Sequence, residues 1–293
     1  MKLVTINTHS LIEENYQKKL EQFVDFTIKE KPDIIAMQEV NQSIDAPVWH
    51  MPLTGFSPSL NMMPPIRKDN HALQAAMKLL ESRNPYYWTW LPVKLGYSKY
   101  DEGMAIFSKR PITEVKCFYI SKFEDYNYWK TRQVLGVKVQ GSSDWFYTVH
   151  MGWWDDKEDC FKEQWERFQM QLQLDNLSYN IWLLGDFNSP AEVRMEGYDL
   201  IKNSGFNDTY FLAKEKDCGI TVEGVIDGWR DKVDDINGLA GMRIDQIWCK
   251  HIPSVRFSKV IFNGQKTPII SDHFGVMIEI DESVFNKGVW TNE

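Results

Sequence analysis

A carboxylate and an amide directly follow one strongly apolar stretch of the chain. The run IWLLGDFNSP passes through Gly185 and then presents Asp186 and Asn188. Because alternate side chains of an extended backbone point the same way, both would reach the same strand end. There a carboxylate can activate water, and an amide can hold a phosphoryl oxygen or a metal-bound water. The same residues are also common in an ordinary turn, so this motif alone leaves both interpretations open.

A second acid lies near the end of another apolar run. In IIAMQEV, Glu39 follows Gln38, at a place where a carboxylate needs a cationic partner. Mg²⁺ takes oxygen ligands and needs only one or two carboxylates, because water and substrate phosphate fill its other positions. Glu39 is therefore a candidate metal ligand. The alternative for this motif is an edge-exposed glutamate without a task.

Two further motifs combine aspartate with histidine. RIDQIW places Asp245 inside an expected strand, and IISDHFGV places Asp272 directly before His273. A buried aspartate is costly unless it is paired, and a histidine suits it because the carboxylate fixes the tautomer and stabilises the charged ring. We therefore predict that Asp245 pairs with His273. Taken alone, SDH would also fit a helix N-cap or a satisfied core histidine.

The remaining candidates are cationic or aromatic. His150 ends the strand in FYTVHMGWW, and Arg132 starts the strand in TRQVLGVKV. A guanidinium fork suits phosphate and a histidine can protonate a leaving oxygen, although an arginine at a strand start is usually a surface residue. Trp153 and Trp154 follow His150, and Trp129 precedes Arg132. Their rings could stack on sugars or bases, or simply fill a core.

The elements that must position these residues can be read from the apolar periodicity. Helical spacing predicts helices over 16–28 and 161–177, and Asp69 and Asn70 are N-cap candidates for a third helix that begins with ALQAAMKLL. Residues 41–69 carry five prolines and are expected to form a long irregular loop. Apolar runs predict strands at 3–7, 34–40, 88–92, 104–108, 115–120, 134–139, 145–150, 181–185, 244–249 and 276–280.

This order of elements predicts an α/β sandwich in which helices flank two packed sheets. The sequence has no repeat and no Gly/Ser linker, so we expect residues 1–293 to form a single domain. The four cysteines share no close spacing, which excludes a zinc knuckle or a CxxC pair. No apolar run is long enough for a secretory leader or a membrane span, so no membrane partner and a cytoplasmic location are expected.

The net charge of −8 bears on the partner, because proteins that bind the phosphate backbone normally present a basic face. Nucleic acid is therefore not the expected partner. A local basic patch such as Lys109–Arg110 or Arg243 could still attract one phosphate, although Lys109–Arg110 also fits an ordinary solvated turn. Apolar residues make up 43% of the chain and charged residues 25%, as in ordinary globular proteins, so the chain should fold.

In combination, these motifs resemble the endonuclease/exonuclease/phosphatase superfamily. TINTH with Asn7, QEV, EGMAIFSKRPI, an arginine before a strand, VHMGW, GDFN, RIDQIW and SDH occur in the family's order, over residues 3–280. Each motif is weak alone, but eight in order are specific. The resemblance implies a four-layered α-β-β-α sandwich of two mixed sheets flanked by helices. It also implies dependence on Mg²⁺ or Mn²⁺ and a site at one end of the sandwich.

The resemblance also implies roles around the metal. Glu39 would be the principal metal ligand, with help from Asn7 and Asp272. Asp186 would orient or deprotonate the attacking water, and Asn188 would help to position the phosphate. The reaction needs no phosphoenzyme, because phosphoryl transfer depends mainly on positioning and on charge neutralisation.

Further roles are implied for the cationic residues. His273, held by Asp245, would donate to the phosphoryl oxygen as charge builds. His150 and Arg132 would clamp the phosphate and assist the leaving group, and Glu102 would orient His150.

The family motifs do not choose the substrate, because superfamily members cut DNA, sphingomyelin, inositol phosphates and small phosphomonoesters. The acidic charge and the tryptophans near the motifs favour a small phosphorylated sugar. The NTHS start and the HMGWWDDKED run are similar to bacterial maltose 6'-phosphate phosphatases. We therefore expect hydrolysis of a phosphorylated disaccharide. The alternatives are a DNA endonuclease or exonuclease of the same superfamily, and a non-catalytic binding protein that retains the fold.

Overall fold

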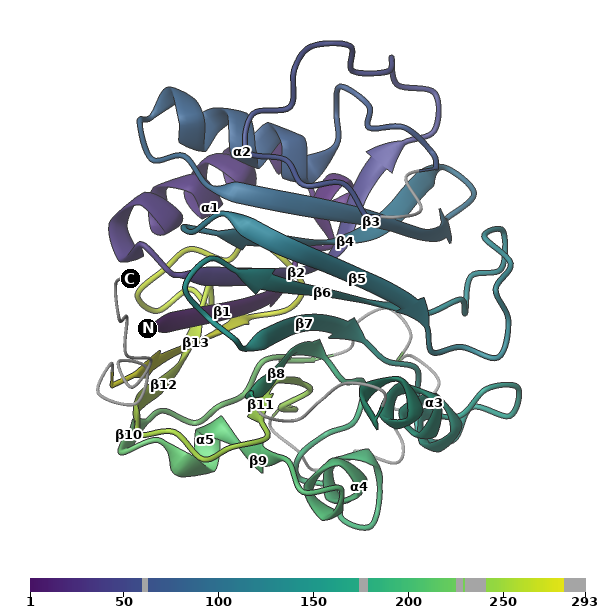
Figure 1. The fold of residues 1–293 in the computed structure, drawn as a ribbon, viewed down its shortest axis with the longest axis vertical. Coiled ribbons are helices and arrows are strands. Elements are labelled where there is room, and N and C mark those ends of the chain that lie inside the picture. The colour runs from purple at the N-terminus through teal and green to yellow at the C-terminus, as the bar shows by residue number, and fades with distance from the viewer. Residues whose placement is uncertain (60–62, 174–178, 225–228, 230–240, 282–293) are drawn as a thin grey trace, which may run out of the picture.

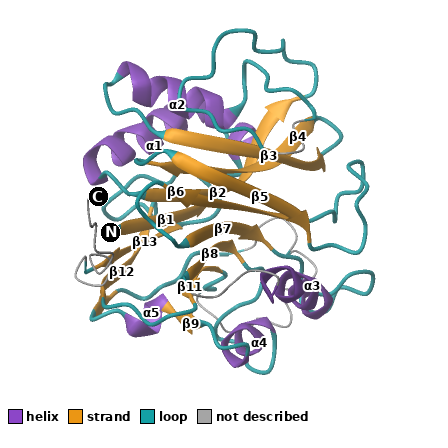
Figure 2. Cartoon of the chain, in the orientation of Figure 1, coloured by secondary structure: helices purple, strands orange, loops and turns teal. Residues whose placement is uncertain are grey.

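Two β-sheets pack face to face between layers of helices (Figures 1 and 2). The computed structural model describes residues 1–59, 63–173, 179–224, 229 and 241–281. The seven-stranded sheet has the order β10-β12-β13-β1-β2-β4-β3, and the six-stranded sheet has the order β5-β6-β7-β8-β11-β9. Each sheet contains both parallel and antiparallel pairs. The expected four-layered sandwich of two mixed sheets is confirmed.

The element bounds are as follows. The seven-stranded sheet comprises β1 (Lys2–Asn7), β2 (Ile34–Ser43), β3 (Tyr87–Gly96), β4 (Tyr100–Ser108), β10 (Glu215–Lys216), β12 (Val255–Ile261) and β13 (Gly275–Ile280). The other sheet comprises β5 (Ile112–Tyr119), β6 (Gln133–Val139), β7 (Trp145–His150), β8 (Ile181–Asp186), β9 (Asn207–Asp208) and β11 (Asp245–Cys249). The described helices are η1 (Ser10–Ile12), α1 (Tyr16–Glu30), α2 (His71–Glu81), α3 (Phe161–Gln173), α4 (Gly197–Asn203) and α5 (Thr209–Leu212).

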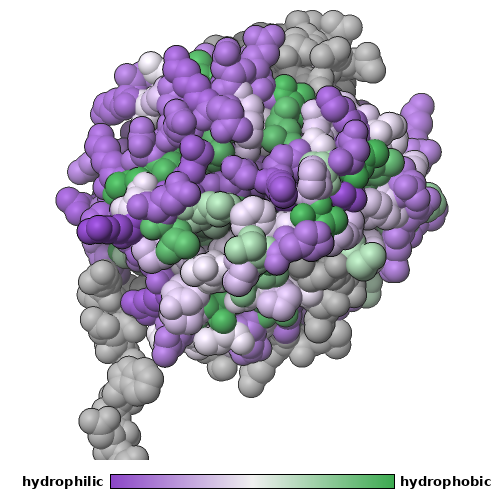
Figure 3. All heavy atoms as spheres, turned by 90° about the horizontal axis from the view of Figure 1, so that it is seen from above, coloured by the Kyte–Doolittle hydropathy of each residue, from purple (hydrophilic) through white to green (hydrophobic). Residues whose placement is uncertain are grey.

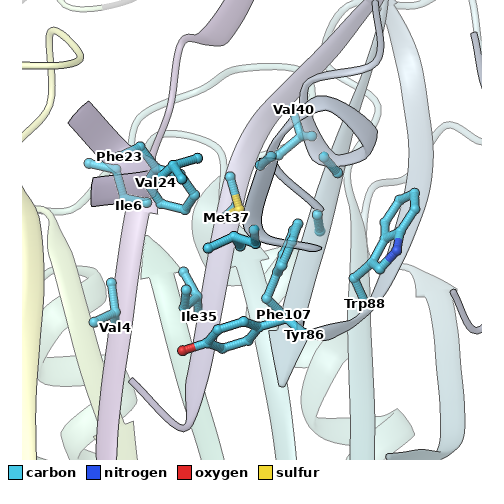
Figure 4. Close-up of a cluster of buried hydrophobic side chains, with 14 of the residues drawn as sticks. Val4, Ile6, Phe23, Val24, Ile35, Met37, Val40, Tyr86, Trp88 and Phe107 are labelled. Carbon is cyan, nitrogen blue, oxygen red and sulfur yellow. The ribbon is translucent and has the colours of Figure 1, made fainter. Parts of the chain in front are cut away.

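Three apolar clusters hold the layers together. In the first, Phe23 and Val24 of α1 pack on Val4, Ile35 and their neighbours in the seven-stranded sheet (Figure 4). The second joins the two sheets, and the third joins the six-stranded sheet to α3 and α4. The outer face seen from above, on the side of α1 and α2, is largely hydrophilic with scattered apolar residues (Figure 3). Apolar burial between layers therefore fixes the positions of the strands.

The predicted helices are present, and the start of α2 follows from local chemistry. Asn70 caps α2 by accepting a hydrogen bond at its side-chain oxygen from the Leu73 N–H, at 3.0 Å. In α1, Leu20, Phe23 and Val24 recur at helical spacing and are buried. The helix expected over 161–177 is described to Gln173, and the rest of that prediction lies outside the described residues.

The sequence analysis missed one long strand and predicted several others too short, β3 and β4 most of all. It did not predict β12, because Arg256 and Lys259 interrupt its apolar pattern on the outward side. Strand β3 continues beyond the predicted end at Pro92, and β4 begins before the predicted start at Met104. The added segments carry Lys94 and Glu102, charged residues that an apolar pattern does not assign to a buried strand.

Parallel strand pairs bring the predicted site residues to one end of the sandwich. In the seven-stranded sheet β1 runs parallel to β2, and Asn7 is the register partner of Gln38, which precedes Glu39. In the other sheet β7 runs parallel to β8, and His150 is the register partner of Asp186. Because parallel strands end at the same edge of a sheet, their terminal residues meet there.

Candidate active site

A cavity of about 380 Å³ opens where these strand ends converge. It gathers most of the residues singled out in the sequence, although they come from distant parts of the chain. Asn7 and Asp245 lie directly behind it and contact residues in its wall. The lining consists of Glu39, Lys94, Gly96, Tyr97, Glu102, Trp129, Arg132, His150, Trp153, Asp186, Asn188 and His273.

The Asp186 carboxylate is the centre of the polar contacts. Its Oδ2 accepts a hydrogen bond from Asn7 Nδ2 at 3.2 Å, and lies 3.6 Å from His150 Nε2 and 3.8 Å from His273 Nε2. Its Oδ1 accepts from the Asn188 N–H at 2.8 Å. Burial raises the pKa of Asp186 to about 7, although His273 favours the charged form. Asp186 can therefore accept a proton near neutral pH.

His273 is held by a fully buried carboxylate. Its Nδ1 lies 2.9 Å from Asp245 Oδ2, so the predicted contact between these residues is confirmed. Burial alone would lower the pKa of His273, but Asp245 and Asp186 outweigh it and raise the pKa to about 10. The ring is therefore cationic at neutral pH. With Nδ1 held by Asp245, Nε2 is left to face Asp186.

His150 has the opposite character. Burial, together with the cations Arg132 and Lys94, holds the pKa of His150 well below its usual value. Its Nε2 lies 3.6 Å from Asp186 Oδ2 and 3.9 Å from Glu39 Oε1. The site thus contains one neutral and one cationic histidine on either side of Asp186.

Glu39 lies at an irregularity in β2. The register between β2 and β4 shifts between Met37 and Val40, and Glu39 has a positive φ of 52°. This left-handed conformation is unfavourable for a non-glycine residue, and such outliers cluster at functional sites. The Glu39 carboxylate accepts a hydrogen bond from Asn7 Nδ2 at 2.9 Å. The bulge and Asn7 together fix the carboxylate at the cavity wall.

Several carboxylates gather around Glu39. Burial, and then the nearby Glu102, raise the pKa of Glu39, and Asp272 adds to this effect. Asp272 does not line the cavity, but lies beside it with its Oδ1 3.8 Å from His9 Nδ1. Oxygen donors crowded together in this way suit a hard divalent cation, which relieves their repulsion. Glu39 and Asp272 therefore offer oxygens that fit such an ion, whereas Asn7 turns its Nδ2 toward Glu39 and Asp186, so its role as a metal ligand stays a prediction.

A neighbouring cluster was not found from the sequence. His9, Glu13 and Asp272 place ligand atoms within 4.8 Å of one another. His9 Nδ1 lies 2.7 Å from Glu13 Oε1, and Lys19 also pairs with Glu13. The spacing of four residues between His9 and Glu13 could have indicated that these two side chains meet. Asp272 comes from a distant part of the chain, and only the fold brings it beside them.

Lys94 is the lining cation that the sequence analysis missed. Its Nζ lies 3.1 Å from Glu102 Oε1 and donates a hydrogen bond to the Trp129 carbonyl at 2.8 Å. Lys94 and Glu102 are register partners across the β3–β4 pair. The ion partner of Glu102 in the structure is therefore Lys94, and not His150 as the resemblance implied. Only the register of this hairpin reveals the pair.

The structure separates the two consecutive tryptophans. Trp153 lines the cavity, with its ring centroid 6.0 Å from the Arg132 guanidinium carbon and 6.0 Å from the Trp129 ring. Trp154 instead packs on the third apolar cluster, 6.4 Å from the Phe161 ring. The prediction that Trp154 binds substrate finds no support in this position, because a hydrophobic contact already occupies its ring.

Asn188 is fixed by its own contacts. Its Nδ2 donates to the Met151 carbonyl at 3.0 Å, and its Oδ1 accepts from Trp229 Nε1 at 2.9 Å. Arg132 is also buried, and its NH1 donates to the carbonyls of Trp129 and Thr131. Both side chains therefore reach the cavity in a rigid orientation.

Comparison with protein-family models matches residues 4–273 to the endonuclease/exonuclease/phosphatase family. The chain belongs to this family. Members of the endonuclease/exonuclease/phosphatase family are hydrolases and generally depend on divalent metals. Together with the clustered carboxylates, this membership assigns the chain to a family of metal-dependent hydrolases.

Solved structures show the same fold. A protein of this family from Leptotrichia buccalis is 30% identical, with a TM-score of 0.82, and the match covers 96% of this chain and 99% of that one. A mannosyl-6-phosphatase from Bacteroides thetaiotaomicron is 16% identical, with a TM-score of 0.64 over 96% and 99% of the two chains. A 3'-5' exonuclease from Neisseria meningitidis is 18% identical, with a TM-score of 0.60 over 96% and 100%.

Comparison with curated protein sequences gave no match. None of the helices that the structure describes is long and apolar enough to cross a lipid bilayer.

Proposed function

We propose that the protein is a Mg²⁺-dependent phosphomonoesterase that hydrolyses a small sugar phosphate, of the maltose 6'-phosphate type, by direct attack of water. The observation that carries this proposal is the form of the cavity, with charged groups at its base and aromatic rings at its rim. A volume of about 380 Å³ lies in the usual range for small-molecule sites. A groove for duplex DNA would need several cationic contacts along the phosphate backbone.

The proposed chemistry assigns the proton acceptor to Asp186. Its Oδ2 takes the proton of the attacking water, and Asn188 helps to hold the phosphoryl group beside it. A raised pKa suits this task, because a base works best when its pKa lies near the operating pH.

The cationic residues act on the charge of the phosphate. His273, held by Asp245, donates from Nε2 to a phosphoryl oxygen, and Arg132 clamps the phosphate with its guanidinium. His150 faces the leaving group as a neutral ring and can hydrogen-bond its oxygen, which takes up a proton from water as the P–O bond breaks. These roles match what phosphoryl transfer requires, which is positioning and neutralisation of charge.

Glu39, Asn7 and Asp272 would hold the cation. When bound, a divalent cation supplies charge neutralisation at the phosphoryl oxygens and favours ionisation of water. Mg²⁺ is the expected ion because the donors are oxygens, and Mn²⁺ accepts similar ligands.

The mannosyl-6-phosphatase similarity agrees with a sugar phosphate, but at 16% identity it supports the fold alone. The exonuclease similarity, at 18% identity, is equally general. The acidic net charge of −8 weighs against DNA as substrate. It is the character of the cavity, rather than these relatives, that favours the sugar phosphate.

The test is hydrolysis of a panel of esters in the presence of Mg²⁺, with phosphate release as the readout. The panel contains disaccharide 6'-phosphates, hexose phosphates, abasic DNA and duplex DNA. We expect disaccharide phosphates to have the highest kcat/KM, and chelation by EDTA to abolish turnover. Asp186→Asn is the control for contaminating phosphatase. Faster cleavage of either DNA substrate would replace this proposal with the nuclease alternative, and no turnover of any ester would favour a binding protein.

A further inference from the structure

We infer that Trp129 and Tyr97 at the rim of the cavity, together with the Lys94–Glu102 pair between the rim and the base, form a separate subsite. This subsite takes a neutral, polyhydroxylated ring, namely the non-phosphorylated sugar of the substrate. The inference rests on the proposed function, which it extends from the phosphate to the rest of the molecule.

The exposure of the lining residues separates the cavity into two parts. At the base, Asp186, Arg132 and His273 are only 1%, 4% and 4% exposed. At the rim, Trp129 is 49% exposed and Tyr97 is 55% exposed. Large aromatic rings are usually buried, so two half-exposed rings beside a cavity indicate a binding surface. The flat C–H face of a sugar ring is a suitable partner for such rings.

A charged pair lies beside these rings. Lys94 donates to the Trp129 carbonyl at 2.8 Å and pairs with Glu102 at 3.1 Å, and both side chains line the cavity. A buried ammonium and carboxylate offer donors and acceptors at fixed positions, which is what recognition of hydroxyl groups requires. Gly96 makes room for this pair, because a Cβ there would lie 2.7 Å from Glu102 Oε2.

The charges near the rim favour a neutral ring over a second phosphate. Lys130 lies over the Trp129 ring, but its ammonium already pairs with Asp156 at 2.7 Å and Glu158 at 2.5 Å. The Lys94 charge is likewise balanced by Glu102. A nucleic acid strand would bring further phosphates to this acidic rim, whereas a sugar would bring only hydroxyl groups.

The rim is also held in place by contacts between its two segments. The Leu95 N–H donates to the Tyr126 carbonyl at 2.7 Å, and the Tyr126 hydroxyl donates to Asp101 Oδ1 at 2.8 Å. These bonds tie the β3–β4 hairpin to the 121–132 segment that carries Trp129. The subsite is therefore preorganised, which lowers the entropic cost of binding.

The test compares Trp129→Ala and Tyr97→Ala with the unaltered protein. Removing a stacking ring should lower kcat/KM for maltose 6'-phosphate about tenfold, mainly through KM. The same variants should hydrolyse glucose 6-phosphate at the unaltered rate, because that substrate lacks the second sugar that the subsite is inferred to bind. The Trp129 carbonyl that holds Lys94 is part of the backbone and survives the substitution. Phe123→Ala is the matched control, since Phe123 is a partly exposed ring of the same segment that does not line the cavity.

A binding measurement separates this inference from the proposed function. Calorimetry with unphosphorylated maltose should show binding to the unaltered protein and to Phe123→Ala, and about tenfold weaker binding to Trp129→Ala. That result supports the subsite even if no sugar phosphate is hydrolysed. If sugar phosphates are hydrolysed but both rim variants keep the same KM, the subsite is wrong and the proposed function stands. Absence of maltose binding to the unaltered protein would also overturn the subsite.

Discussion

At the scale of single residues, the site consists of ionisable groups whose neighbours push their pKa values in different directions. Asp245 and Asp186 raise the pKa of His273 to about 10, whereas burial and nearby cations lower the pKa of His150. When the pKa values of similar groups are shifted apart in this way, one group can act as a proton donor and the other as an acceptor. Asp245 itself does not line the cavity, so it acts through His273.

The Asp245→Asn variant tests this indirect role. An amide holds the ring without stabilising its positive charge, so kcat should fall about 100-fold, within the range for loss of one acid–base group. The pH profile of kcat should shift at the same time, because the pKa of His273 is no longer raised by Asp245. Asp25→Asn, at an exposed position of α1, is the control for the loss of one carboxylate. An unchanged pH profile in Asp245→Asn would show that Asp245 is merely structural.

At the scale of elements, strand ends carry the site. The motif residues Asp186, Asn188 and His150 were predictable because each follows an apolar run that marks a strand. Lys94 and Glu102 were not predictable in the same way, because the charged ends of β3 and β4 do not look like buried strands. Their pairing depends on hairpin register, which a single sequence does not specify when one strand contains an irregularity.

The start of α2 allows a direct test of a predicted cap. Asn70→Ala removes the acceptor for the Leu73 N–H and the donor to Gln42 Oε1, at 3.1 Å. The free energy of unfolding should fall by about 1–2 kcal/mol in denaturant titrations. Asn70→Asp keeps a side-chain acceptor for the Leu73 N–H, so its free energy of unfolding should fall less than that of Asn70→Ala. Equal losses in the two variants would show that the bond to Gln42, rather than the cap, is the important contact.

A pH effect is expected at the same helix start. Burial lowers the pKa of His71 to about 4, from 6.5 in the unfolded chain. The unfolded state therefore binds a proton first, and stability falls as pH decreases from 6.5 towards 4. This shift corresponds to up to about 3 kcal/mol.

The His71→Gln variant removes this proton-binding group but keeps an acceptor for the Tyr16 hydroxyl, which lies 3.0 Å from His71 Nδ1. Denaturant titrations at several pH values should show a shallower loss of stability between pH 6.5 and 4 than in the unaltered protein. Parallel curves for the two proteins would contradict the assigned pKa of His71.

At the scale of the whole molecule, one end of the sandwich concentrates charge while the layers are held together by apolar packing. The pattern of strands and helices predicted two packed sheets flanked by helices, and the resemblance of the ordered motifs to the endonuclease/exonuclease/phosphatase superfamily implied the four layers. The rim of the cavity was not predictable, because it depends on segments such as 121–132 that have no periodic pattern. That residues 1–293 form a single domain stays a prediction.

Metal binding should be visible in the stability of the whole protein. A ligand that binds only the folded state stabilises it. At a Mg²⁺ concentration of 100 times Kd the free energy of unfolding should rise by about 3 kcal/mol, and the melting temperature should rise with it. EDTA should reverse the shift. Glu39→Gln should reduce the response to Mg²⁺, whereas Asp45→Asn, which changes an exposed acid elsewhere in the chain, should not. A full response in Glu39→Gln would remove Glu39 from the metal site.

The arrangement of the cavity wall has a consequence for the history of such proteins. Glu39, His150 and Asp186 at its base are carried by β2, β7 and β8, in the middle of the sheets, while its rim comes from the β3–β4 turn with Tyr97 and from the 121–131 segment with Trp129. Insertions or substitutions in those two peripheral segments would alter which substrates the cavity binds, without moving the central strands. Divergence in substrate choice can therefore proceed by replacing surface segments, while the catalytic apparatus is inherited unchanged.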